Sequence, residues 1–133
     1  MNPTLTTSEL EYLHGQRLGR LATVDPTGAP QNNPVGFTFD EATGQILIGG
    51  HRMGESRKFR NVQRNPKAAF VVDDLASVDP WVVRGVEIRG TAEALENAEL
   101  TRPGMSGEVI RITPRWIGSW GIDSHFRDLQ ARA

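Results

Sequence analysis

Cysteine is absent from the 133-residue sequence, which excludes disulfide bonds, thiolate metal sites and a cysteine nucleophile. Long apolar runs are absent too, since none approaches the roughly 20 residues that span a bilayer. The first four residues, Met-Asn-Pro-Thr, lack the charged and apolar regions of a signal peptide. We therefore expect a cytoplasmic protein with no membrane partner, in which a cofactor carries any redox chemistry.

An excess of charge of one sign is also lacking. The chain has 15 Lys and Arg against 16 Asp and Glu, for a formal net charge of −1. Because nucleic-acid-binding domains usually have a dominant basic face, we expect no nucleic-acid partner, and only the basic segment 51–64 keeps that alternative open. The shares of hydrophobic residues, 38%, and charged residues, 23%, are those of an ordinary folded protein, and the length favours a single domain over 1–133.

Short stretches with strand-like alternation dominate the chain. The sequence Thr6-Thr7-Ser8-Glu9 has the pattern of a capping box and predicts a short helix that ends near Gly15. Six strands are predicted, at residues 18–24, 30–39, 45–48, 67–73, 81–95 and 109–120, with 74–80 as a loop. Gly90 is a weak point of the fifth strand, and Pro114 marks an edge or a bulge. Many antiparallel strands with few helices favour a mainly β protein with a closed or half-closed barrel.

The segment from His51 to Arg64 holds five of the 15 Lys and Arg residues. It follows an apolar strand that ends at Gly49 and Gly50. From Ser56 the spacing is helical, with Phe59 and Val62 on one side. Cations at the start of a helix, where the backbone amides are unpaired, favour a bound anion. We therefore predict a phosphate-type site here. The alternative is a basic helix face in water.

Three segments together resemble the split β-barrel flavin and deazaflavin oxidoreductases related to pyridoxamine 5′-phosphate oxidase. The first runs from Gly19-Arg20-Leu21-Ala22-Thr23-Val24 to Pro34-Val35-Gly36-Phe37, the second is Ser56-Arg57-Lys58 with Asn65-Pro66, and the third is Arg84-Gly85-Val86-Glu87-Ile88-Arg89-Gly90. The resemblance covers roughly residues 8 to 122. It implies a six-stranded antiparallel split β-barrel with short flanking helices, a homodimer, and a cofactor in each of two grooves at the subunit interface.

The same resemblance implies a role for each matching residue. Ser56, Arg57 and Lys58 would hold the cofactor phosphate. The strand that contains Asn33, Pro34, Val35 and Gly36 would lie beside the cofactor ring, with Gly36 allowing a close backbone approach. Ile48, Gly49, Gly50 and His51 would form the groove floor and the turn under the cofactor side chain.

The chain also departs from the vitamin B6 oxidases. Those enzymes carry an Arg-x-Val-Leu-Leu-Lys strand whose arginine also grips the flavin phosphate, whereas this chain has Asn32-Asn33-Pro34-Val35-Gly36-Phe37. Three other features instead resemble the branch of small proteins, mostly from actinobacteria, that use the deazaflavin coenzyme F420. They are Gly50-His51, the run Arg57-Lys58-Phe59-Arg60-Asn61-Val62, and the ending Ser119-Trp120-Gly121-Ile122-Asp123. The polyglutamate tail of F420 would account for Arg52, Arg60 and Arg64, which exceed the needs of one phosphate.

The resemblance thus implies an F420-dependent oxidoreductase that transfers a hydride to an electron-poor small molecule such as an enone, quinone or imine. No side chain is nominated as an acid or base. Two alternatives remain open: an FMN-binding flavin reductase or oxidase with the same fold, and a non-catalytic carrier or sensor of the cofactor. The spacing of the three histidines gives no basis for a metal site. Trp116 and Trp120 share one face of a strand and are interpreted as core or dimer interface.

Overall fold

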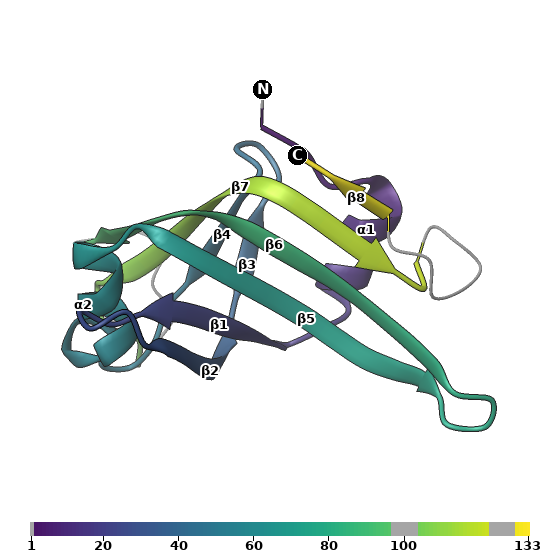
Figure 1. Cartoon of the computed structure of the whole chain (residues 1–133), viewed down its shortest axis with the longest axis horizontal. Coiled ribbons are helices and arrows are strands. Elements are labelled where there is room, and N and C mark those ends of the chain that lie inside the picture. Colours follow the sequence, from purple (N-terminus) through teal and green to yellow (C-terminus); the bar gives the residue numbers. More distant parts are fainter. Residues whose placement is uncertain (1, 97–103, 123–129) are drawn as a thin grey trace.

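The computed structural model describes residues 2–96, 104–122 and 130–133 (Figure 1). Two α-helices and one 3₁₀ turn accompany the strands: α1 (Thr7–His14), η1 (Met53–Glu55) and α2 (Arg57–Arg64). The strands of the described residues are β1 (Leu18–Val24), β2 (Pro30–Gly36), β3 (Thr38–Asp40), β4 (Gln45–Ile48), β5 (Lys67–Ser77), β6 (Val82–Leu95), β7 (Val109–Trp120) and β8 (Gln130–Arg132).

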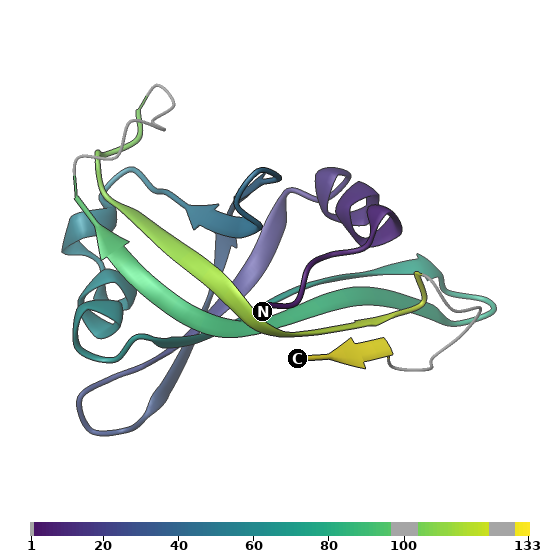
Figure 2. The ribbon, with the colours of Figure 1, turned by 90° about the horizontal axis from the view of Figure 1, so that it is seen from above.

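All described strands belong to one antiparallel sheet with the order β2-β1-β5-β6-β7-β4-β3, and β8 adds to β7. The two end strands, β2 and β3, are consecutive in the chain, with only Phe37 between them. The sheet must therefore curl until its ends meet at Phe37, which produces the half-barrel of Figures 1 and 2. The mainly β half-barrel agrees with the sequence prediction.

The sheet of the described residues has eight strands, so the expected count of six is not confirmed. The expected strand 30–39 divides at Phe37, since β2 pairs with β1 while β3 pairs with β4. β8 supplies the other additional strand. A strand of three residues is too short to show an alternation of apolar and polar residues, so β8 could not be predicted. Phe37 interrupts the strand pairing but not the pattern of apolar residues, so the division into β2 and β3 could not be predicted either.

The interior of the half-barrel is filled by one core of aliphatic and aromatic side chains. Along β7 the residues Ile110, Ile112 and Ile117 are fully buried. The inward side changes along this strand because the pairing with β6 shifts by one residue between Arg89 and Gly90, opposite Pro114. Of the two alternatives predicted for Pro114, an edge or a bulge, the bulge is therefore confirmed, and it lies at Gly90, the predicted weak point. Its absence would turn Ile117 away from the core, since neighbouring residues on a strand face opposite sides.

Helix α1 begins with the predicted capping box. Thr6 Oγ1 accepts from the Glu9 amide at 3.1 Å, and Glu9 Oε1 accepts from the Thr6 amide at 2.9 Å. Glu9 is fully buried, and its carboxylate also accepts from Ser119 Oγ at 2.5 Å and from the Arg132 guanidinium. Burial alone raises the pKa of Glu9, but these donors outweigh it and lower the pKa below its ordinary value. One carboxylate thus joins α1 to β7 and β8.

The predicted loop 74–80 is wrong in its first half, because β5 continues to Ser77 and forms a long hairpin with β6. Asp74 explains the continuation. Its carboxylate accepts from Arg84 Nε at 3.0 Å and Nη2 at 2.6 Å, and from the Tyr12 hydroxyl at 2.9 Å. A carboxylate satisfied by a facing arginine can sit within a sheet, so aspartate does not end this strand. The hairpin projects from the end of the half-barrel opposite α2 (Figures 1 and 2).

No helix among the described residues is long and apolar enough to cross a membrane.

Candidate functional site

Helix α2 brings the basic segment into a defined position. Ser56 is its N-cap: the hydroxyl accepts from the Phe59 amide at 3.2 Å and donates to the Met53 carbonyl at 2.6 Å. Phe59 and Val62 are buried, as predicted, and fix the inner side of the helix. The first helical residues, Arg57 and Lys58, therefore stand where backbone amides are free and the dipole is positive.

Arg57 and Lys58 line a hollow of about 480 Å³ together with Gln31, Asn32 and Asn33 of β2. We call it the lysine hollow. Neither cation makes an ion pair within 4.0 Å among the described residues. The hollow thus combines two positive charges with polar amide side chains, which suits a phosphate group.

A second hollow of about 260 Å³ shares Arg57 and Gln31 with the first. We call it the arginine hollow, and it is lined by Asp25, Pro26, Gln31, Arg57, Arg60, Asn61 and Arg64. Three guanidinium groups surround it against a single carboxylate.

That carboxylate, Asp25, is held in its charged form. Its oxygen accepts from Thr27 Oγ1 at 2.6 Å and from the Ala29 amide at 2.9 Å. These hydrogen bonds, with the charge of Arg57, lower the pKa of Asp25. Even with this negative charge, the arginine hollow keeps an excess of positive charge that favours carboxylates or phosphates.

The three arginines assigned to a cofactor tail have different surroundings. Arg60 and Arg64 line the arginine hollow, and Arg60 Nη2 also donates to the Glu55 carbonyl at 2.8 Å. Arg52 lines neither hollow and pairs with Glu55 at 2.5 Å, an exposed i,i+3 contact. The surplus of cations at this end therefore consists of Arg60 and Arg64.

The glycine turn after β4 is tied to the segment that precedes β7. The Gly50 carbonyl accepts from the Ser106 amide at 2.8 Å and from Ser106 Oγ at 3.1 Å. The exposed His51 contacts the Gly104 carbonyl through Nδ1 at 2.5 Å. This arrangement brings Met105 and Ser106 beside Gly49, at the edge of a larger pocket.

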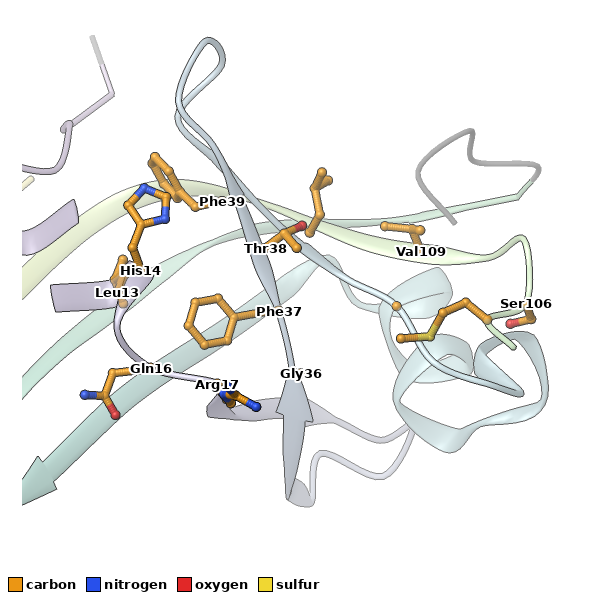
Figure 3. Close-up of a pocket in the computed structure, with 13 residues that line it drawn as sticks. Leu13, His14, Gln16, Arg17, Gly36, Phe37, Thr38, Phe39, Ser106 and Val109 are labelled. Atoms are coloured by element: carbon orange, nitrogen blue, oxygen red, sulfur yellow. The ribbon is translucent and has the colours of Figure 1, made fainter. Parts of the chain in front are cut away.

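This larger pocket, the central pocket, has a volume of about 560 Å³ (Figure 3). Residues from the end of α1 lie along one side of the β2–β3 segment, and residues that lead into β7 lie along the other. Its lining is Leu13, His14, Gln16, Arg17, Gly36, Phe37, Thr38, Phe39, Leu47, Gly49, Met105, Ser106 and Val109. The mixture of apolar walls and a few polar groups is typical of a small-molecule site.

Strand β2 connects the central pocket with the lysine hollow. Asn33 lines the hollow and Gly36 lines the pocket, and three residues of extended strand span about 10 Å. Gly36 is exposed, and a Cβ added there would meet nothing within 4 Å. A ligand with a ring in the pocket and an anionic group beside α2 could therefore follow β2.

The sequence-predicted residues fall into five groups. Asn33, Arg57 and Lys58 share the lysine hollow, while Arg60 lines the arginine hollow. Gly36 and Gly49 line the central pocket. Gly50 and His51 follow Gly49 in the chain and do not line the pocket. The side chains of Val35 and Ile48 are 6% and 0% exposed and belong to the core, so only their backbone can meet a ligand. Pro34 is exposed on β2 but lines none of these cavities, and the Ser56 hydroxyl already caps α2.

Sequence reasoning missed many of the lining residues, among them His14, Arg17 and Gln31. His14 and Arg17 lie on either side of Gly15, the residue that ends α1. This predicted helix end is the signal that could have placed the two side chains at the edge of a cavity. Gln31 is held in place by Asn61, whose side-chain amide donates a hydrogen bond to it at 2.8 Å. No sequence pattern predicts a hydrogen bond between residues 30 positions apart.

A model of the pyridoxamine 5′-phosphate oxidase family matches residues 5–121, which include every element of these cavities. The chain belongs to this family. The resemblance seen in the sequence is thereby confirmed at the level of the family.

Among relatives in the family, the chain is 50% identical to the 5a,11a-dehydrotetracycline/5a,11a-dehydrooxytetracycline reductase of Streptomyces rimosus subsp. rimosus, over 95% of this chain and 94% of that protein. The protein Rv2991 of Mycobacterium tuberculosis has a similar structure, with a TM-score of 0.70 and 24% identity over 88% of this chain and 85% of that one. An FAD-binding protein of Mesorhizobium loti has a TM-score of 0.63 and 18% identity, over 88% and 94% of the two chains. The reductase relative supports an oxidoreductase, and the two structures show the family's fold.

Proposed function

We propose that this protein is a coenzyme F420-dependent reductase that acts on an electron-poor small organic molecule. A relative at 50% identity is named as the reductase of a dehydrotetracycline. A carbon–carbon double bond conjugated to carbonyl groups is electron-poor and accepts a hydride. The acceptor class proposed for this chain is therefore a conjugated ring compound such as an enone or a quinone.

The observation that carries the choice of F420 is that helix α2 borders two cationic hollows rather than one. FMN has a single phosphate, which the lysine hollow would suffice to bind. F420 has a phosphate and, further along, the carboxylates of its polyglutamate tail. Arg57 lines both hollows, so it would lie between the two anionic parts, with Lys58 on one side and Arg60 and Arg64 on the other.

The residues of the chain bind, orient and exclude water in this proposal. When bound in its reduced form, F420 would supply the hydride for the acceptor's double bond, and the accompanying proton would come from solvent or the pocket. Arg57 and Lys58 hold the phosphate, and Gly36 and Gly49 leave room for the ring. Phe37, packed edge-on against Phe70 at 5.1 Å, keeps one wall of the central pocket rigid. The rate gain would come from proximity and orientation.

A homodimer completes the proposal. Four large apolar side chains are exposed among the described residues: Leu18, Leu75, Val78 and Trp81, at 63%, 43%, 68% and 56%. Three of them belong to the projecting β5–β6 hairpin or the turn at its tip. The outer edges of β2 and β3 have no neighbouring strand in the described part of the chain. A second copy of the chain would bury the exposed apolar side chains and cover the unpaired strand edges.

Two other functions make different predictions about binding. An FMN-dependent reductase or oxidase of the same fold needs only the lysine hollow, so the arginine hollow would have no role. A non-catalytic carrier or sensor would bind F420 but would transfer no hydride.

The choice of cofactor is tested by titrating the protein with F420 and with FMN over a range of salt concentrations. We expect F420 to bind more tightly and to lose affinity faster as salt increases, because more ionic contacts are screened. Arg60→Gln and Arg64→Gln should reduce the difference in affinity between F420 and FMN. Gln63→Ala, on the exposed side of the same helix, should leave that difference unchanged. Equal affinities with equal salt slopes would favour FMN.

A further inference from the structure

The central pocket is lined by one cationic side chain whose charge the described residues leave uncompensated. Arg17 lies in the connection between α1 and β1, is exposed, and has no ion pair within 4.0 Å in the described part of the chain. Figure 3 shows it on the same side of the β2–β3 segment as His14 and Gln16. The binding of the cofactor phosphate and tail, assigned above to α2, does not use Arg17.

The carboxylates near this side of the pocket are already engaged. Glu41 contacts His14 Nε2 at 2.8 Å. Asp74 pairs with Arg84 at 2.6 Å and receives the Tyr12 hydroxyl at 2.9 Å, and Gln16 Nε2 reaches it at 3.5 Å. The hydrogen bonds from Arg84 lower the pKa of Asp74, so it stays ionised and bound to its partners. No acidic residue is among the described residues that line the pocket.

A guanidinium group that has no ion-pair partner among the described residues, at the edge of a pocket with apolar walls, is suited to an anionic oxygen on a flat organic molecule. Its planar set of donors matches a deprotonated hydroxyl beside a carbonyl, and Phe37 and Leu13 supply the apolar surface for the ring. The pocket's volume of about 560 Å³ is in the range of small-molecule sites.

We propose that Arg17 determines acceptor specificity by binding an anionic oxygen, so that the acceptor is an acidic ring compound such as a hydroxyquinone or an enolised diketone. The proposal rests on the proposed function, because it names the substrate class of that site. Arg17 contributes to the binding of the acceptor and not to the hydride transfer. Its removal therefore affects KM and leaves kcat nearly unchanged.

The test uses a matched pair of acceptors. Lawsone is a hydroxynaphthoquinone that is an anion at neutral pH, and its methyl ether is neutral with almost the same shape. Binding of both is measured by calorimetry on the purified protein, with and without F420. We expect the anion to bind about tenfold more tightly than the ether, as for one hydrogen bond to a charged group. This preference should diminish in high salt.

Variants assign the preference to one side chain. Arg17→Gln should abolish it by weakening only the anion, and Arg17→Lys should retain part of it because the charge remains. Arg20→Gln is the control, since Arg20 is a nearby exposed arginine that pairs with Asp73 and does not line the pocket. Because Arg17 is exposed, its variants should melt within about 2 °C of the parent, as surface substitutions do.

The outcomes separate this inference from the proposed function. Equal binding of the two quinones by the parent, or an equal loss for both in Arg17→Gln, would overturn the role of Arg17. A lawsone preference that depends on Arg17, without any reduction of either quinone by reduced F420, would support the role of Arg17 and count against the reductase. In turnover, the KM for lawsone should rise in Arg17→Gln, and the KM for the ether should not.

Discussion

The side-chain amide of Asn61 donates a hydrogen bond of 2.8 Å to Gln31 Oε1, and this bond joins the basic helix α2 to the β1–β2 hairpin. Asn61 is 5% exposed, and its amide nitrogen also donates to Thr23 Oγ1 at 3.0 Å. Gln31 lines both the lysine hollow and the arginine hollow. The buried amide therefore sets the distance between the cations of α2 and the polar residues of β2.

Asn61→Ala should lower the free energy of unfolding by about 1–3 kcal/mol, because Gln31 and the buried Thr23 lose a hydrogen-bond donor. It should also weaken cofactor binding, since both hollows lose a fixed wall. Urea denaturation and cofactor titration measure the two effects. Gln63→Ala is the control, with an expected change within about 0.5 kcal/mol. An unchanged denaturation midpoint for Asn61→Ala would contradict this role.

Lys58→Ala and Arg57→Ala should each weaken cofactor binding by about 1.5–3 kcal/mol, the range for a hydrogen bond to a charged group. The fold should remain intact, because neither residue makes an ion pair among the described residues. Arg57→Ala should weaken F420 more than Lys58→Ala does, since Arg57 lines both hollows. Dissociation constants equal to those of the parent would make the basic segment a plain solvated face.

Local patterns predicted the elements that depend on near neighbours in sequence. The capping box at Thr6, the strand 109–120, the edge or bulge at Pro114 and the apolar side of α2 were all visible in the sequence. The division at Phe37 and the continuation of β5 through Asp74 were not, because they depend on strand pairing and on Arg84. Arg57 and Lys58 were found from the cations at the start of the helical segment, in agreement with the family resemblance, and Asn33 was found through the resemblance alone. Arg17 and Gln31 were missed because contacts distant in sequence bring them to their cavities.

The stability of the chain should fall in acid through Glu9. The folded-state pKa of Glu9 lies below its ordinary value of 4.5, because hydrogen bonds from Arg132, Ser119 and Thr6 outweigh the effect of burial. Its contribution is therefore complete above pH 4.5 and is lost as the pH falls through the lowered pKa. We expect Glu9→Gln to cost about 3 kcal/mol at neutral pH, because Arg132 loses its partner.

The difference between Glu9→Gln and the parent should shrink below pH 4.5, as followed by urea denaturation at a series of pH values. Glu11→Gln, on the exposed side of the same helix, should show no such difference at any pH. A difference in the free energy of unfolding between Glu9→Gln and the parent that stays constant into strong acid would contradict this role of Glu9.

The proposed homodimer should be visible by sedimentation at micromolar concentration. Trp81→Ser should weaken it, because Trp81 is 56% exposed in the single chain and supplies apolar surface at the projecting hairpin. The expected result for the variant is a larger monomer fraction and weaker cofactor binding. A parent protein that is monomeric and still binds the cofactor at full strength would contradict the interface groove.

The transfer of hydrogen from cofactor to acceptor tests the central claim most directly. Reduced F420 carrying deuterium at its reactive ring carbon is mixed anaerobically with the protein and an electron-poor enone, whose reduction forms a carbon–hydrogen bond. We predict one equivalent of oxidised F420 for each product molecule, with deuterium retained in the product of the enone. Tight binding of reduced F420 without any oxidation across a broad panel of such acceptors, or equal activity with reduced FMN alone, would contradict an F420-dependent reductase.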